Sequence, residues 1–224
     1  MRIVCFVLFF VLFLLPPTSQ AQDFPWPADQ PDQWLLAFVD VETTGLVPGF
    51  HEMIDAGFVY TDLEGKEVGQ LFVQMMPDHP ERLSQGAADV NGFSIQRWKE
   101  LDAVSQADAV QRIIAFHDSV AQGKNVLMVA LNSHFDAAFM DHLLRGQNHS
   151  WRELYHYFIL DLPSMAWSLG LRDLTGADLC ARLVIEDEPH DPSLHTGITG
   201  AALNARIYRA LVNYRRDQKE KTLE

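Results

Sequence analysis

The alternation of apolar and polar positions predicts a sheet whose later strands alternate with helices. The runs that begin at Trp34 and Asn125 are almost continuously apolar, as in strands buried on both faces. The runs that begin at Met53 and Val68 flank the turn residues Asp62–Lys66 and predict an antiparallel hairpin. The runs with strand character are Trp34–Val41, Met53–Tyr60, Val68–Met76, Asn125–Leu131 and Tyr157–Leu160.

Apolar residues at helical spacing fill the segments between the later strands. Ser105 and Thr175 are suited to cap two of these helices, and the segment from Ser164 to Leu169 is also expected to be helical. The stripes are Val110, Ile113, Ile114, His117 and Val120; Phe135, Phe139, Met140, Leu143 and Leu144; Leu179 and Leu183; and Leu203, Ile207, Ala210, Leu211 and Tyr214. A hairpin followed by strand–helix alternation predicts an α/β protein with a mixed sheet covered by helices on both faces.

The N-terminal segment has the layout of a secretory signal peptide. Residues 3–15 are 13 apolar residues without a charge, about 20 Å as a helix and short of the ~30 Å hydrocarbon core. Prolines and the small residues Ser19 and Ala21 follow, as at a cleavage site. We expect residues 1–21 to be a signal peptide of an exported protein, secreted or periplasmic; a membrane anchor through residues 3–15 is the alternative. The remaining chain divides into a linker (22–33), a domain (34–214) and a charged tail (215–224).

Charge and cysteine content narrow the class of protein. The net charge of −13 excludes a broad basic footprint for duplex nucleic acid, although metal ions can neutralise phosphate in place of lysines. Loss of the signal peptide removes Cys5 and leaves Cys180, so the exported domain has no internal disulfide, and Cys180 is expected to be a buried thiol.

Asp40 and Glu42 are two acids at the end of an otherwise apolar strand. Alternate residues leave the same face of a strand, about 6.6 Å apart, and two like charges there are costly without a cation. Carboxylate oxygens suit Mg²⁺ or Mn²⁺, so the pair predicts a metal site. The alternative is that the strand ends early and water solvates both acids.

Three segments in order resemble the motifs of the DEDD 3′–5′ exonucleases of the proofreading-subunit type. Phe38–Leu46 (FVDVETTGL) resembles the first motif, and Asn132–Met140 (NSHFDAAFM) resembles the second, with Asp136 as its carboxylate. His195–Ala202 (HTGITGAA) resembles the third motif of the histidine-bearing branch, and the similarity extends over residues 35–214.

This resemblance implies a ribonuclease H-like exonuclease fold, with a five-stranded mixed sheet, a central first strand and helices on both faces. It implies two metal ions, Mg²⁺ or Mn²⁺, held by Asp40, Glu42 and Asp136, with Glu42 also a catalytic residue and His195 as the base for the attacking water. The residues implied to contact the substrate are Thr43, Thr44, Gly45, Leu46, whose side chain would pack on the terminal base, and Phe135. The implied function is metal-dependent 3′–5′ exonuclease activity on short or single-stranded nucleic acid, and the sequence is compatible with DNA or RNA.

Gly200 departs from the family pattern. The family has a metal-binding aspartate five residues after the histidine, and here that position is glycine. Water, or Glu188 or Asp191 from the preceding loop, would then fill the vacancy in a weakened enzyme. The alternative is a catalytically lapsed protein that binds nucleic acid or nucleotides. We expect glycine to give no structural gain at a helix start and to leave room for a restored aspartate.

Ala166–Gly170 (AWSLG) approximates the nucleophile turn of serine hydrolases, which would make Ser168 the nucleophile. That turn requires a strand leading directly into it, whereas Pro163 and the helical segment that follows argue against this class.

Overall fold

The computed structural model describes residues 24–223, so the predicted signal peptide or anchor within residues 1–21 lies outside the described residues. Its sheet has the strand order β3-β2-β1-β4-β5, with β1 in the centre. The hairpin strands β2 and β3 are antiparallel to their neighbours, whereas β4 and β5 run parallel to β1. The strands are β1 (Trp34–Thr43), β2 (Met53–Thr61), β3 (Glu67–Gln74), β4 (Asn125–Ala130) and β5 (Ile159–Asp161).

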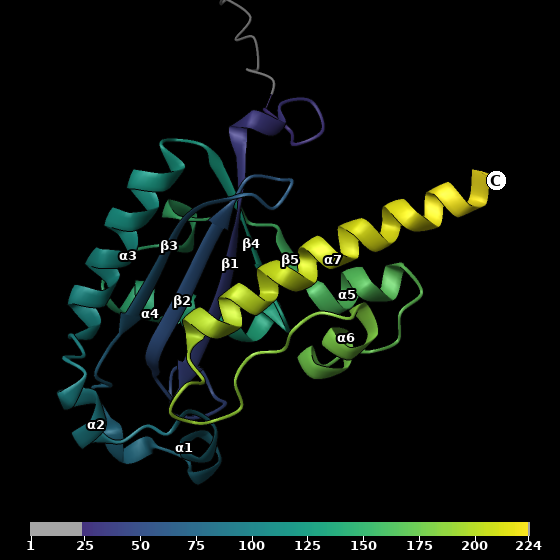
Figure 1. Cartoon of the computed structure of the whole chain (residues 1–224). Coiled ribbons are helices and arrows are strands. Elements are labelled where there is room, and N and C mark those ends of the chain that lie inside the picture. Colours follow the sequence, from purple (N-terminus) through teal and green to yellow (C-terminus); the bar gives the residue numbers. More distant parts are fainter. Residues whose placement is uncertain (1–23, 224) are drawn as a thin grey trace, which may run out of the picture.

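Helices cover both faces of this sheet (Figure 1). They are α1 (Gln85–Asn91), α2 (Ile95–Glu100), α3 (Gln106–Ala121), α4 (Ser133–Gly146), α5 (Leu162–Ser168), α6 (Gly176–Leu183) and α7 (Gly197–Leu223). Short 3₁₀ turns lie at Pro31–Gln33, Pro80–Arg82 and Trp151–Glu153. The predicted α/β class, with its five-stranded mixed sheet, is confirmed.

Alternate residues of β1 supply two separate cores. Leu35, Ala37 and Val39 pack with α3 and α4 on one face. Leu36 and Phe38 pack with α5, α6 and α7 on the other. The continuous apolar run in the sequence therefore corresponds to a central strand that is buried from both sides. Asp40 and Glu42 continue the second set, so their side chains leave toward the face that α7 covers.

The C-terminal end of β1 has a strand neighbour on one side only. β4 pairs with β1 from Trp34 to Phe38 and then ends, whereas β2 continues alongside as far as Thr43. Two side chains replace the missing strand. Asn204 of α7 donates a hydrogen bond to the carbonyl of Val39 (2.9 Å), and the amide of Val41 donates to Oδ1 of Asp136 (3.1 Å).

Some segments have more structure than the sequence pattern indicates. Helices α1 and α2 were not predicted, because each is short and its start depends on a local cap by Ser84 or Ser94. Helix α7 continues through residues 215–223 of the predicted tail. In the predicted linker, Phe24 packs edge-on against Trp34, whose indole N–H donates to the carbonyl of Pro25.

The helices and the remaining cysteine can be compared with the predictions of a membrane anchor and a buried thiol. Within residues 24–223, none of the helices combines the length and apolar character needed to cross a bilayer. Cys180 is a buried free thiol, as predicted, and burial raises its pKa to about 11.

Candidate active site

Three predicted carboxylates meet at the open end of β1. Asp40 and Glu42 come from the strand itself, and Asp136 comes from the first turn of α4, which is separated from β4 by two residues. The hydrogen bond from Val41 to Asp136 ties α4 to the strand between the two acids. Glu42 and Asp136 are almost completely buried.

The two aspartates of this cluster are surrounded mainly by other acids. Burial raises the pKa of Asp40 well above its ordinary value, and the neighbouring charges of Asp136, Glu42, Glu188 and Asp55 raise it further. The pKa of Asp136 is also raised, chiefly by burial, although hydrogen bonds from backbone amides oppose the shift. Both aspartates therefore favour a proton or a cation close by.

His195 lies just before α7 and contacts Glu42 directly. Its Nε2 is 3.0 Å from Oε1 of Glu42, and its Nδ1 is 3.2 Å from the carbonyl oxygen of Pro189. The hydrogen bond to Glu42 raises the pKa of His195 to about 9 against the opposing effect of burial. The imidazole is therefore a cation near neutral pH in this arrangement, rather than the free base that an unperturbed pKa suggests.

Of the two loop acids considered from the sequence, Glu188 is the one that enters the site. Its Oε2 lies 3.6 Å from Nδ1 of His195 and 3.4 Å from the hydroxyl of Thr199, which donates to it. Burial raises the pKa of Glu188, and the charge of Glu42 adds to the effect. Asp191 instead accepts hydrogen bonds from the amide and hydroxyl of Ser193.

Gly200 lies against Asp40. A Cβ added at residue 200 would approach the carboxylate of Asp40 more closely than any normal contact allows. The expectation that glycine leaves room and gives no structural gain is therefore wrong, because the missing side chain makes space for Asp40. Position 200 faces the acidic cluster, as the motif alignment requires.

Three residues outside the predicted set support the site. Asn91 of α1 donates from Nδ2 to Oε2 of Glu42 (3.3 Å) and to the carbonyl of Thr43 (3.0 Å). Asp55 of β2 accepts the amide of Gly197 at the start of α7 (2.9 Å), and burial raises its pKa to about 8. A lone acid in the apolar run Met53–Tyr60 was the available sequence signal for Asp55.

Arg97 is the third of these residues. Its guanidinium donates to the carbonyls of Asn91, Gly92, Pro192 and Ser193. It therefore joins the end of α1 to the loop that leads into His195. Its partners are backbone carbonyls, which leave no pattern of residue types, so this role could not be predicted from the sequence.

A mainly apolar cavity of about 400 Å³ opens beside Glu42. Thr43, Leu46 and Phe135 line it, together with α1 residues such as Val90. Thr44 and Gly45 do not line this cavity. Thr44 is buried and exchanges hydrogen bonds with the backbone of Glu52, and a Cβ at Gly45 would meet the ring of His51. Their contacts fix the loop that presents the highly exposed Leu46.

The donor chemistry of the cluster suits a hard divalent cation. Asp40, Glu42 and Asp136 offer carboxylate oxygens only, and the raised pKa values of the two aspartates would be relieved by a positive charge. Among residues 24–223, however, no three acidic, histidine or cysteine side chains already surround one point as ligands of a single ion. Glu42 is instead paired with His195.

Ser168 shows no sign of being a hydrolase nucleophile. It lies at the end of α5 rather than on a turn after a strand, and its hydroxyl donates to the carbonyl of Met165 (2.7 Å).

The fold and the arrangement of acids are those that the resemblance to 3′–5′ exonucleases led us to expect. No family model matches the chain. In sequence, the chain is related to the 3′–5′ DNA exonuclease Cap18 of Escherichia coli, with 24% identity over 186 residues, which are 80% of this chain and 92% of that protein. The resemblance to 3′–5′ exonucleases is thus confirmed by a relative of similar length.

Solved structures establish the fold independently. Exonuclease I of E. coli, in its zinc-bound complex with single-stranded DNA, superposes with a TM-score of 0.66 at 18% identity over 85% of this chain. A 3′-exonuclease that recognises a histone mRNA stem-loop superposes with a TM-score of 0.62 at 15% identity over 80% of this chain. The chain spans about two fifths of exonuclease I (43% of the zinc-bound structure).

Proposed function

We propose that this protein is a metal-dependent 3′–5′ exonuclease acting on single-stranded or short nucleic acid. The observation that carries the proposal is the meeting of Asp40, Glu42, Asp136 and His195 at one strand end, beside a cavity lined by Leu46 and Phe135. The exonuclease relatives supply the reaction class. The acidic composition favours short ends over long duplexes, because few cations are available to follow a phosphate backbone.

We propose Mg²⁺ or Mn²⁺ as the ion, held by Asp40, Glu42 and Asp136. When bound, it would supply an activated water and neutralise charge that develops on the phosphate. The apolar side chains of Leu46 and Phe135 would hold the terminal base in the cavity. Because Nδ1 of His195 faces the carbonyl of Pro189, the neutral ring keeps its proton there, and the second proton of the cationic ring is the one that Nε2 shares with Glu42. Once Nε2 has given this proton to Glu42 or to solvent, it is the atom able to accept the proton of the water.

A second candidate is nucleic acid binding without hydrolysis, and Gly200 is the observation that favours it. The site has lost one carboxylate of the family motif, and Asp40 occupies the space next to residue 200. Binding through the cavity does not require that carboxylate, whereas hydrolysis depends on correctly placed charge.

The two candidates separate in one pair of measurements. Purified protein is incubated with single-stranded DNA or RNA labelled at the 5′ end, with Mg²⁺ or Mn²⁺, and the products are resolved by length. We expect a ladder that shortens from the 3′ end, abolished by Asp40→Asn and by a blocked 3′ terminus. Binding without shortening, measured by fluorescence anisotropy in folded and metal-saturated protein, would support the second candidate and refute the first.

We also propose that the protein is exported, on the basis of the apolar residues 3–15 and the small residues after them. Sequencing of the N-terminus from the native host tests this. A start near Gln22 is the expected result, and an intact Met1 in the membrane fraction would identify an anchor instead.

A further inference from the structure

The end of the domain opposite the active site carries an exposed aromatic cluster. Its members are Phe24, Trp26, Tyr157 and Phe158, which are 39–58% exposed. Their rings are connected through His156, with centroid separations of 5.6 Å to Phe24, 4.4 Å to Tyr157 and 5.2 Å to Phe158. Phe24 and Trp26 are 4.7 Å apart. Large exposed aromatic groups that contact one another mark an interaction surface.

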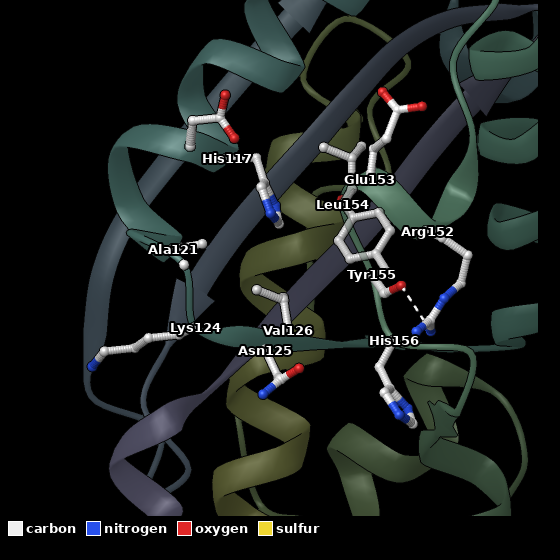
Figure 2. A pocket seen from close by; sticks show the side chains of 12 residues that line it. His117, Ala121, Lys124, Asn125, Val126, Arg152, Glu153, Leu154, Tyr155 and His156 are labelled. Carbon is white, nitrogen blue, oxygen red and sulfur yellow. Dashed lines mark hydrogen bonds between the residues drawn. The ribbon is translucent and has the colours of Figure 1, made fainter. Parts of the chain in front are cut away.

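A polar cavity with basic side chains lies beside these rings. It has a volume of about 260 Å³ and is lined by the end of α3, the start of β4 and the segment Arg152–His156. Lys124 and Arg152 are its two cations, and Figure 2 shows the guanidinium of Arg152 pointing toward the carbonyl of Tyr155. The same guanidinium lies 5.5 Å from the ring centroid of Tyr157 and so joins the cavity to the aromatic cluster.

Two acids also line this cavity, but one of them is engaged elsewhere. The carboxylate of Glu153 contacts His149 (2.7 Å) and accepts the amide of Ser150 (2.8 Å), and Figure 2 shows it turned away from Arg152. Asp118 is the other acid. Among the lining acids, only Asp118 is therefore left to oppose Lys124 and Arg152.

The position of this surface in the chain indicates what covers it. Phe24 is the first described residue, and the apolar run of residues 3–15 ends nine residues before it, within about 30 Å of extended chain. In Figure 1 the segment from Phe24 to Gln33 lies at the end of the sheet away from α1 and α2. In the uncleaved chain, in which residues 3–15 serve as the membrane anchor, the bilayer is therefore within reach of the aromatic rings.

We propose that this surface lies on a lipid bilayer, with the aromatic side chains in the interfacial layer and Arg152 and Lys124 against lipid phosphates. Trp and Tyr favour the depth of the headgroups, where an apolar ring and a polar edge are both accommodated, and cations pair there with phosphate. Glu42 follows the start of β1 by eight residues, about 26 Å along the strand. Seated in this way, the protein would direct its active site away from the membrane.

The test follows the environment of two labelled positions in the full chain. Phe158→Cys places an environment-sensitive dye in the aromatic cluster. Trp167→Cys is a matched control, because Trp167 is 52% exposed and also stacks with an arginine, Arg172, on another part of the surface. Both are made in a Cys5→Ser background, and the buried Cys180 with its raised pKa stays unlabelled.

In phosphatidylcholine vesicles we expect the dye at residue 158 to brighten about twofold or more, with a shift to shorter wavelength, because it enters the apolar interfacial layer. The dye at residue 167 should not change. Arg152→Glu combined with Lys124→Glu should remove the effect at residue 158. Exonuclease activity on a free oligonucleotide should stay the same in these variants, since none of the substituted residues belongs to the active site.

Three results would overturn the proposal. Equal responses at residues 158 and 167, including no response at either, would show that this surface has no preference for the bilayer. A shifted spectrum at residue 158 in lipid-free buffer would mean that residues 1–23 of the same chain cover the cluster. Stabilisation by inorganic phosphate that depends on Arg152 and Lys124, with no effect of vesicles, would make the cavity a site for a free anion.

Discussion

Replacing Gly200 by aspartate should change the stability of the protein in opposite directions without and with metal. The new side chain starts where the carboxylate of Asp40 lies, so Asp40 has to turn. Turning it about 30° from its preferred rotamer costs roughly 0.5–1.5 kcal/mol, which the loss of a helical glycine offsets by a similar amount. The added charge is the larger effect, because two carboxylates 4 Å apart repel by about 4 kcal/mol at an effective dielectric constant near 20.

We therefore expect Gly200→Asp to lower the metal-free free energy of unfolding by on the order of 2–4 kcal/mol at pH 8. The loss should shrink at pH 5, where the carboxyl groups with raised pKa, such as that of Asp40, take up protons instead. With metal we expect the extra carboxylate to act as a ligand. Exonuclease activity should then rise at least about tenfold, which is about 1.4 kcal/mol in the transition state.

Urea unfolding with and without Mn²⁺, together with shortening of a 5′-labelled strand, measures both effects. Gly200→Ala is the matched control, because it displaces Asp40 without adding a charge, and it should lower activity. If Gly200→Asp and Gly200→Ala have equal metal-free stability at both pH values, residue 200 does not face the charged cluster. If His195→Ala leaves the gain in activity intact, His195 is not the base.

Three further predictions concern single contacts. Asp55→Asn should raise the free energy of unfolding more at pH 8 than at pH 5. The folded pKa of Asp55 is about 8 against an ordinary 3.8, so the unsubstituted protein loses stability as the pH rises through this range. Urea unfolding at both pH values measures the difference, with Asp217→Asn as the exposed control. His195→Gln should lower the free energy of unfolding of the metal-free protein by about 3 kcal/mol at pH 6 and by little at pH 10. The protonated His195, with its raised pKa, stabilises the folded state, and this contribution is lost as the pH rises through about 9. Equal losses at the two pH values would contradict this. Arg97→Gln should lower the free energy of unfolding by about 1–3 kcal/mol and reduce activity, and unchanged activity would show that the loop before His195 is held by other contacts.

The sheet was predictable from the sequence because its signals are local. A strand buried on both faces must be apolar throughout, so Trp34–Val41 was recognisable, and the alternation of Asp40 with Glu42 was enough to place both acids on one face. The turn between the two hairpin strands was visible in the same way. The central place of β1 came from the family resemblance, since periodicity carries no information on strand order.

The surroundings of the acids depend on contacts that periodicity does not encode. Helix α1 has only seven residues and one cap, so the helix that carries Asn91 could not be predicted from the sequence. The loop that brings Glu188 to His195 is held by Arg97, which binds backbone carbonyls. The fit of Gly200 against Asp40 depends on how closely α7 approaches β1. The raised pKa of His195 likewise follows from a partner contributed by a distant strand.

The unpaired half of β1 also bears on how the active site forms. The carbonyl of Val39 and the amide of Val41 find their partners 165 and 95 residues further along the chain, in α7 and α4. The hairpin of β2 and β3, by contrast, closes over a short turn and is inexpensive in loop entropy. We expect the hairpin to form early and the catalytic end of β1 to become ordered only when both helices have docked. Amide hydrogen exchange at Val41 would then report the docking of α4, so this single proton serves as a probe of whether the active site is assembled.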